Sequence, residues 1–402
     1  MHSQTHKYGG FISTLVRSLW RSSSRTYFGI AVLCTLLVVL FITLNQKNAT
    51  TAPISQPRRQ ELEFYWPHWN RTEYATGDLL WRLYHLQQFT SPPEMNIGTL
   101  FDRTKIPRII HQSWKTTKLP LLVKNYVSKW VTLHSNWTYI FWTDKSSREF
   151  VDVYFHPLLQ VYDAYLHSVQ RADMFRYLVL YTFGGVYADI DMEPLKSLEA
   201  IRDWAPCIFS HEPDAHGKVS SCALLSDVNN YTLISNALMA CRPGHPYVFF
   251  LITQLVDRSP LLEPKLDCGL EATLPCTGPS LVSETITYYN RAVELTPQTL
   301  PTNRVMLANY TYFLPTFAPA QLGNIKRQCS SENVHLRPEG VATCQVLNNT
   351  GFRNEVHSHS FTVHRWMSSY HHEGPYKTFE LDEVAPGYRM FPKFDVEQAF
   401  FQ

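Results

Sequence analysis

The fold of this chain is best indicated by residues 170–191, QRADMFRYLVLYTFGGVYADID. Apolar side chains recur there at the spacing of a buried helix face and predict a helix over 170–183: Met174, Phe175, Leu178, Val179 and Phe183. Gly184 follows at the position where helices commonly end. Residues 185–189 then have the character of a short buried strand, so a helix leads through a glycine turn directly into a strand.

Two more strands are expected before this helix. Residues 107–112 and 138–142 are rich in β-branched and aromatic residues, and a helix is expected between them at 121–133. This alternation is typical of an α/β protein with a mostly parallel sheet and helices on both faces. In such sheets ligands bind at the carboxyl ends of the strands, which is where Asp189 and Asp191 fall.

Asp189 and Asp191 are candidates for a metal site. Two carboxylates that follow a strand can point into one site, and carboxylate oxygens are preferred ligands of Mg²⁺ and Mn²⁺. Asp173 and Arg176 lie three residues apart on the preceding helix and therefore share a face. They form either a surface ion pair that contributes little or a pair that binds sugar hydroxyls or phosphate oxygens near the strand end.

The block from Arg171 to Asp191 resembles the glycosyltransferases with a DXD sugar-binding region. These include fungal α-1,6-mannosyltransferases, inositol-phosphoceramide mannosyltransferases and, more distantly, animal α-1,4-galactosyl- and N-acetylglucosaminyltransferases. Other segments resemble the family in the same order: 106–115, 141–144, 236–239, 243–246, 277–279 and 364–366. The resemblance implies a single GT-A (Rossmann-like) domain with a mixed sheet flanked by helices, a retaining reaction, a divalent metal (Mn²⁺ or Mg²⁺) and a nucleotide-sugar donor.

The resemblance also implies roles for individual residues. The strand Ile110-His111-Gln112 would lie under the nucleotide base, and Asp173 and Arg176 would hold the donor sugar. Tyr187 and Asp189 would reach the ribose or the sugar.

The same resemblance implies a site for a metal and a diphosphate. Asp189 and Asp191 would bind the metal, His364 would be the third ligand and Trp366 would lie near the diphosphate. Asp191, Arg176 and Asp173 are therefore the expected catalytic group. The alternative for His364 is an ordinary histidine in a histidine-rich tail.

The amino-terminal part of the chain predicts a membrane anchor. Residues 27–44 carry no charge and, as a helix, would span roughly 27 Å. Basic residues without acidic ones precede this segment, which places residues 1–26 in the cytoplasm. We expect a single-pass type II protein of the Golgi membrane, with a lumenal stem over 45–104 and the catalytic domain over 105–402. A cleaved signal peptide is the alternative, and residues 248–256 are too short for a second span.

Sequons and cysteines agree with a lumenal location. Six sequons begin beyond the anchor, at Asn48, Asn70, Asn136, Asn230, Asn309 and Asn348. Seven of the eight cysteines also lie there, where disulfides form. Cys268 with Cys276 and Cys329 with Cys344 are plausible pairs, and the odd number leaves one free thiol or a disulfide to another chain, for example in a homodimer.

The composition of the chain excludes one class of partner. The net charge of +2 over 402 residues provides no basic field, so nucleic acid is not an expected partner. The leading hypothesis is transfer of a hexose, mannose from GDP-mannose, to a glycan or an inositol-phosphoceramide-like glycosphingolipid. UDP-galactose or UDP-N-acetylglucosamine as donor, a metal-dependent hydrolase and a non-catalytic lectin-like membrane protein are the alternatives. Two segments, 209–236 and about 318–355, depart from the family pattern and are expected to carry acceptor specificity.

Overall fold

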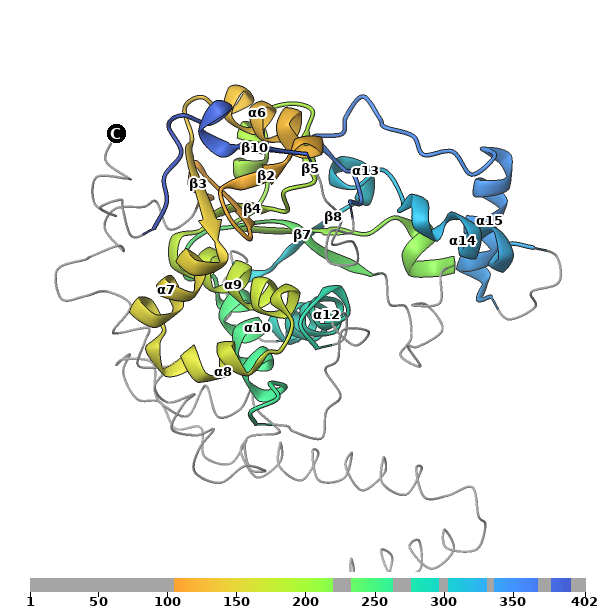
Figure 1. The fold of residues 1–402 in the computed structure, drawn as a ribbon. Helices are drawn as coiled ribbons and strands as arrows, with labels where there is room; N and C mark the ends of the chain where they lie inside the picture. Colours follow the sequence, from red (N-terminus) through yellow and green to blue (C-terminus); the bar gives the residue numbers. More distant parts are fainter. Residues whose placement is uncertain are drawn as a thin grey trace, which may run out of the picture. The chain divides into compact units, whose positions relative to one another are not determined.

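The computed structural model describes residues 105–219, 233–262, 276–295, 303–330, 336–367 and 377–391. Their centre is a six-stranded sheet with the strand order β3-β1-β4-β7-β6-β8 (Figure 1). The strands are β1 Ile109–Trp114, β3 Thr138–Thr143, β4 Gly185–Ala188, β6 Cys207–His211, β7 Ile234–Cys241 and β8 Met306–Ala308. All neighbours pair in parallel except β7, which is antiparallel to both β4 and β6. The predicted α/β class and the first three strands are confirmed.

Helices cover both faces of the sheet because neighbouring residues of a strand point to opposite sides. Ile109 of β1 belongs to one hydrophobic core and Ile110 to the other. The first core is closed by α7 Asp144–Tyr154, α8 Leu159–Ala164, α9 Ser168–Phe183, α10 Pro246–Asp257 and α12 Pro279–Leu295. The second is closed by α6 Lys124–Leu133 and α13 Tyr310–Phe313. Residues 248–256, which are too short for a second membrane span, are part of α10.

Helix α9 is buried on nearly every side, which its sequence did not predict. The expected apolar face is buried, but so are Tyr177, Leu180 and Tyr181 outside it. The reason is that α10 packs against α9 away from the sheet, while Asn236 of β7 and Thr277 cover the face that carries Asp173 and Arg176. Asp173 and Arg176 are therefore buried as well, and the interpretation of this pair as a surface ion pair is wrong.

The turn between α9 and β4 requires its two glycines. Gly184 and Gly185 have φ values of 65° and 90°, which other residues rarely adopt. A Cβ on Gly185 would lie 2.6 Å from the carbonyl oxygen of Ile109. The carbonyl of Gly184 accepts a hydrogen bond of 3.0 Å from Nε2 of His111, which lies fully buried in β1. The sheet and the turn are thus held together at the end of β4 that lies away from Asp189.

His111 makes stability depend on pH. Burial lowers the pKa of His111 to about 4, from 6.5 in the unfolded chain. The neutral ring is therefore favoured in the folded state. Its contribution to the free energy of unfolding is fully present above pH 6.5 and is lost as the pH falls toward 4. A shift of this size corresponds to about 3 kcal/mol. Urea unfolding at several pH values should show a shallower fall in stability for His111→Gln than for the wild type, whereas His156→Gln, at an exposed site, should leave the wild-type slope unchanged.

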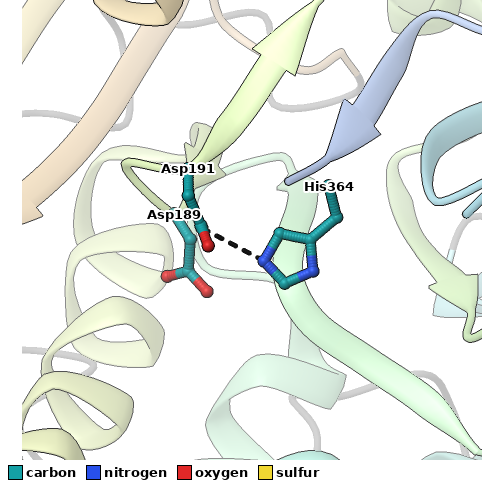
Figure 2. A group of neighbouring side chains, drawn as sticks. All are labelled: Asp189, Asp191 and His364. Atoms are coloured by element: carbon teal, nitrogen blue, oxygen red, sulfur yellow. Dashed lines mark hydrogen bonds and ion pairs between the residues drawn. The ribbon is translucent and has the colours of Figure 1, made fainter. Parts of the chain in front are cut away.

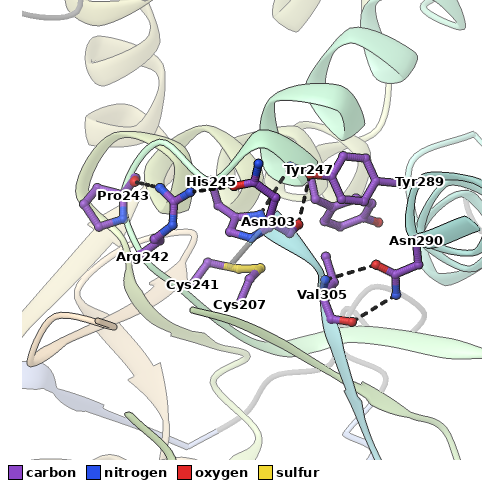
Figure 3. The surroundings of a disulfide bond; sticks show 10 residues. All are labelled: Cys207, Cys241, Arg242, Pro243, His245, Tyr247, Tyr289, Asn290, Asn303 and Val305. Carbon is purple, nitrogen blue, oxygen red and sulfur yellow. Dashed lines mark hydrogen bonds between the residues drawn. A yellow bond between two sulfur atoms is a disulfide. The ribbon is translucent and has the colours of Figure 1, made fainter. Parts of the chain in front are cut away.

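Disulfide bonds link two strands of the sheet and two helical segments near the carboxyl-terminal end of the described chain. Cys207 and Cys241, for which no pairing was predicted, join β6 to β7 at the end away from Asp189 (Figure 3). Near this disulfide, Asn290 of α12 holds Val305 through two hydrogen bonds, just before β8. The predicted pair Cys329–Cys344 is confirmed. Cys276 is also disulfide-bonded, whereas its predicted partner Cys268 lies outside the described residues.

The segment after Ala318 forms a small unit of its own. Helices α14 Leu322–Gln328 and α15 Pro338–Asn349 pack on η6 Ala215–Val219, a π-helical turn (Figure 1). A separate hydrophobic cluster joins them, with Val219, Ile325 and Leu347 among its members. We call residues 317–352 the helical unit. It corresponds to the second segment that departs from the family pattern.

Several predictions fall on parts of the chain outside the described residues: the tail 1–26, the anchor 27–44, the stem 45–104, and the sequons at Asn48, Asn70 and Asn230. Asn136, Asn309 and Asn348 are described, and all three side chains are exposed. Among the described helices, none combines the length and apolar character that crossing a membrane requires.

Candidate active site

Asp189 and Asp191 come together with His364, which is 173 residues further along the chain than Asp191. Both aspartates lie just after β4, and the chain then enters β5 Met192–Pro194. This short strand pairs antiparallel with β9 Thr362–His364, and Met192 is the register partner of His364. Nε2 of His364 therefore lies 3.1 Å from Oδ1 of Asp191 (Figure 2). Candidate ligand atoms of all three residues lie within 4.8 Å of one another.

The charges in this group are unequal. Burial favours the neutral form of Asp191, but the charge and hydrogen bond of His364 and the backbone N–H of Met367 outweigh it and lower the pKa of Asp191. Burial, reinforced by Asp191 and opposed by Arg176, raises the pKa of Asp189 to about 6. For His364, burial acts against the charged ring, yet the carboxylate of Asp191 raises its pKa. Negative charge is thus concentrated on Asp191, next to a basic imidazole.

The three side chains fit a divalent cation. Two carboxylates and an imidazole nitrogen are suitable donors for Mn²⁺ or Mg²⁺, which commonly complete their coordination with water and substrate phosphates. Nδ1 of His364 is buried and has no hydrogen-bond partner among the described residues. This nitrogen lies on the side of the ring away from the two aspartates, so Nε2 is the atom that would bind a cation between them (Figure 2). Asp189, with 27% of its side chain exposed, is the ligand most open to solvent.

Arg176 contacts two carboxylates and a backbone carbonyl beside the candidate metal ligands. Its guanidinium lies 3.2 Å from Asp189 and 3.3 Å from Asp173, and donates to the carbonyl oxygen of Asn236 at 2.8 Å. The same group lies over the ring of Tyr187, 4.8 Å from its centroid. Only 7% of the side chain is exposed. Most of its donors are therefore used to orient the protein's own acidic groups.

Asp173 is held by neutral donors as well as by Arg176. Nδ2 of Asn236 donates to Oδ1 of Asp173 at 2.9 Å, and the hydroxyl of Thr277 donates to Oδ2 at 2.7 Å. Asn236 also donates to the hydroxyl of Tyr177. Despite these partners, burial raises the pKa of Asp173. Thr277, in a segment that resembles the family, thus helps to hold this carboxylate in place.

The residues expected under the nucleotide base lie inside the fold. Ile110, His111 and Gln112 are fully buried. Gln112 accepts a hydrogen bond from Tyr139 and donates to the carbonyl oxygen of Asp189 at 3.1 Å. Tyr187 is also buried, and its hydroxyl bonds to Ser113. These side chains support the strand ends and Arg176, and their contact with a donor stays a prediction.

Trp366 lies next to the acidic group. Its ring centroid is 4.0 Å from that of His364, and its indole N–H donates to the carbonyl oxygen of Thr316 at 2.8 Å. The side chain is half-buried. Its position beside the metal residues agrees with the expected diphosphate site, although contact with a diphosphate stays a prediction.

Residues 120–207 match the family described as the glycosyltransferase sugar-binding region containing the DXD motif. The chain carries this DXD region. The match includes Asp173, Arg176 and both aspartates after β4, so the resemblance seen in the sequence is confirmed.

Curated relatives of the DXD region include fungal mannosyltransferases. The chain is 34% identical to inositol phosphoceramide mannosyltransferase 2 of Schizosaccharomyces pombe over 42% of this chain and 44% of that protein. It is 31% identical to inositol phosphoceramide mannosyltransferase 3 of the same organism over 37% of each. It is 29% identical to that organism's initiation-specific alpha-1,6-mannosyltransferase over 46% and 48%. The chain thus spans less than half the length of each of these relatives.

Sequence reasoning missed several residues around the DXD region. Asn236 and Thr277 were noted only as matches to the family, and Glu212, His216 and Thr316 were not noted. The pattern around Asn236 carried a signal, because two polar residues, Ser235 and Asn236, stand in the otherwise apolar and buried strand β7. The other residues reach the site only through tertiary packing and leave no local pattern.

Proposed function

We propose that this protein is a retaining glycosyltransferase of the GT-A type that transfers mannose from GDP-mannose to a glycan or an inositol-phosphoceramide-like glycosphingolipid. The observation that carries the proposal is the convergence of Asp189, Asp191 and His364 beside Arg176 at the carboxyl end of β4. The names of the mannosyltransferase relatives support the choice of sugar. UDP-galactose and UDP-N-acetylglucosamine are the alternative donors.

In this proposal Asp189, Asp191 and His364 hold Mn²⁺ or Mg²⁺. When bound, the cation supplies Lewis-acid stabilisation of the charge on the departing diphosphate. Asp191 is prepared for this task because the Met367 N–H and His364 favour its charged form. Arg176 keeps Asp189 and Asp173 oriented, so that binding requires little rearrangement. Asp173 presents a carboxylate for sugar hydroxyls next to Asn236.

The cellular setting is part of the same proposal. The uncharged segment 27–44 would anchor the protein in the Golgi membrane as a type II protein, with the catalytic domain in the lumen. The exposed sequons at Asn136, Asn309 and Asn348 are accessible to glycosylation there. A lipid acceptor would then be presented at the same membrane.

Metal-dependent donor binding tests the proposal. We expect the full-length chain, purified in detergent with its disulfides intact, to melt at a higher temperature with Mn²⁺ plus GDP-mannose than with either alone, because a ligand that binds the native state stabilises it. UDP-galactose and UDP-N-acetylglucosamine should give smaller shifts. Release of free mannose without transfer to an acceptor would favour a hydrolase. A folded protein that responds to none of the donors would contradict the proposed function.

A further inference from the structure

Trp366 has a backbone conformation that needs support. Its φ is 53°, in the left-handed region that bulky residues rarely occupy. Such strain persists where the surroundings hold it, and it is frequent at ligand-binding sites. Thr316 fixes the indole nitrogen, and its hydroxyl also donates to the carbonyl oxygen of His364. These hydrogen bonds fix the edge of the indole that carries its nitrogen. The rest of the ring is held by the side chains that contact it.

His216 is packed against the Trp366 ring. The two ring centroids are 4.7 Å apart and the planes meet at 77°, an edge-to-face contact. His364 lies against the same indole at 4.0 Å. Trp366 is therefore in contact with a candidate metal ligand and with a histidine that comes from a different element, η6.

Two hydrogen bonds lock the His216 ring. The backbone N–H of Ala318 donates to Nε2 at 3.0 Å, so Nε2 is an acceptor. Nδ1 therefore carries the proton and donates to Glu212 at 2.8 Å. Both side chains are only 8% exposed. A buried carboxylate paired in this way keeps the imidazole in one tautomer and one orientation.

The helical unit holds η6 in place. Ala318, which bonds to His216, lies at the start of this unit. On α15, Gly340 packs so closely on η6 that a Cβ would meet the carbonyl oxygen of Lys218 at 2.6 Å. The Cys329–Cys344 disulfide links α15 to the residue that follows α14. The helical unit therefore contacts His216, and His216 in turn contacts the Trp366 ring.

We propose that Glu212 and His216 are positioning residues that fix Trp366 for donor binding, and that the helical unit sets their place. This inference rests on the proposed function, in which Trp366 lies at the donor diphosphate. It assigns the helical unit a role in donor affinity, in addition to the acceptor specificity expected from the sequence.

Steady-state kinetics of the full-length chain test this inference. With GDP-mannose and Mn²⁺, His216→Leu should raise the donor KM about tenfold, the lower end of the loss caused by removing groups that support metal ligands. It should change kcat and the acceptor KM much less. His216→Gln retains an acceptor for Ala318 and a donor for Glu212, and should recover part of the loss. A donor KM within twofold of the wild type in His216→Leu would overturn the inference.

His134 provides a matched control. Its Nε2 also accepts a backbone N–H, from Leu198 at 2.9 Å, and its ring packs against Trp130 and Trp137. His134→Leu should lower the melting temperature as His216→Leu does, while leaving the donor KM unchanged at temperatures where both variants are folded. Equal effects of the two variants on the donor KM would show a general loss of packing and overturn the inference.

A double-mutant cycle separates this inference from the proposed function. The melting temperatures of His216→Leu, Trp366→Ala and the double variant should be non-additive, because the two rings are in contact. These melting temperatures are measured in the absence of a nucleotide sugar. If wild-type protein does not respond to any nucleotide sugar, the proposed function and the donor role of Trp366 both fail, whereas additive effects would disprove the His216–Trp366 coupling itself.

Discussion

Replacing Asp191 with asparagine is expected to lower sugar transfer by about two to three orders of magnitude. The asparagine side chain would still accept a hydrogen bond from the Met367 backbone, so the loop should keep its shape. It would lose the negative charge that His364 stabilises and that a divalent cation requires. The Mn²⁺-dependent rise in melting temperature with GDP-mannose should disappear together with transfer activity.

Asp203→Asn is a suitable control for this result. Asp203 pairs with Lys105 at the surface, and 72% of its side chain is exposed. Loss of an exposed pair costs little, so both the donor-dependent shift and the activity should remain. If Asp191→Asn retained the metal-dependent shift, the cation would have to bind elsewhere, and the group formed with Asp189 and His364 would not be a metal site.

The sequence predicted those parts of the fold that depend on local pattern. The helix at α9, the glycine turn and the strand at β4 follow from apolar spacing and from glycine's conformational freedom. The same pattern placed Asp189 and Asp191 at a strand end. His364 could be associated with them only through the resemblance to a family, because it arrives by the pairing of two three-residue strands.

The remaining parts of the site depend on packing between distant segments. β7 runs antiparallel beside β4 and brings Asn236 next to Asp173. The amphipathic pattern of α9 suggested an outer face for Asp173 and Arg176, yet Asn236 of β7 and Thr277 cover it. Likewise, His216 approaches Trp366 only because the helical unit packs on η6. No local periodicity encodes such contacts.

Replacing Arg176 with methionine is expected to lower the free energy of unfolding by about 3 to 5 kcal/mol. Methionine fills much of the same volume but leaves the carboxylates of Asp173 and Asp189 without the guanidinium that neutralises them. Removal of one partner from a buried ion pair costs this much because the remaining charge is uncompensated. Urea denaturation followed by circular dichroism would measure the loss. Arg176→Lys should be intermediate, since one ammonium cannot reproduce the guanidinium's contacts with Asp173, Asp189 and Asn236.

Adding Asp173→Asn to Arg176→Met should restore part of the lost stability. The asparagine would keep an acceptor for Asn236, and its amide could donate to the hydroxyl of Thr277, so a buried charge would be removed without losing both hydrogen bonds. Coupling of about 1 to 3 kcal/mol between the two substitutions is expected for groups in one network. Transfer activity should not return, because Asp189 would remain without its guanidinium partner. If Arg176→Met instead kept wild-type stability and lost only activity, the guanidinium would act on the donor directly rather than by orienting the protein's carboxylates.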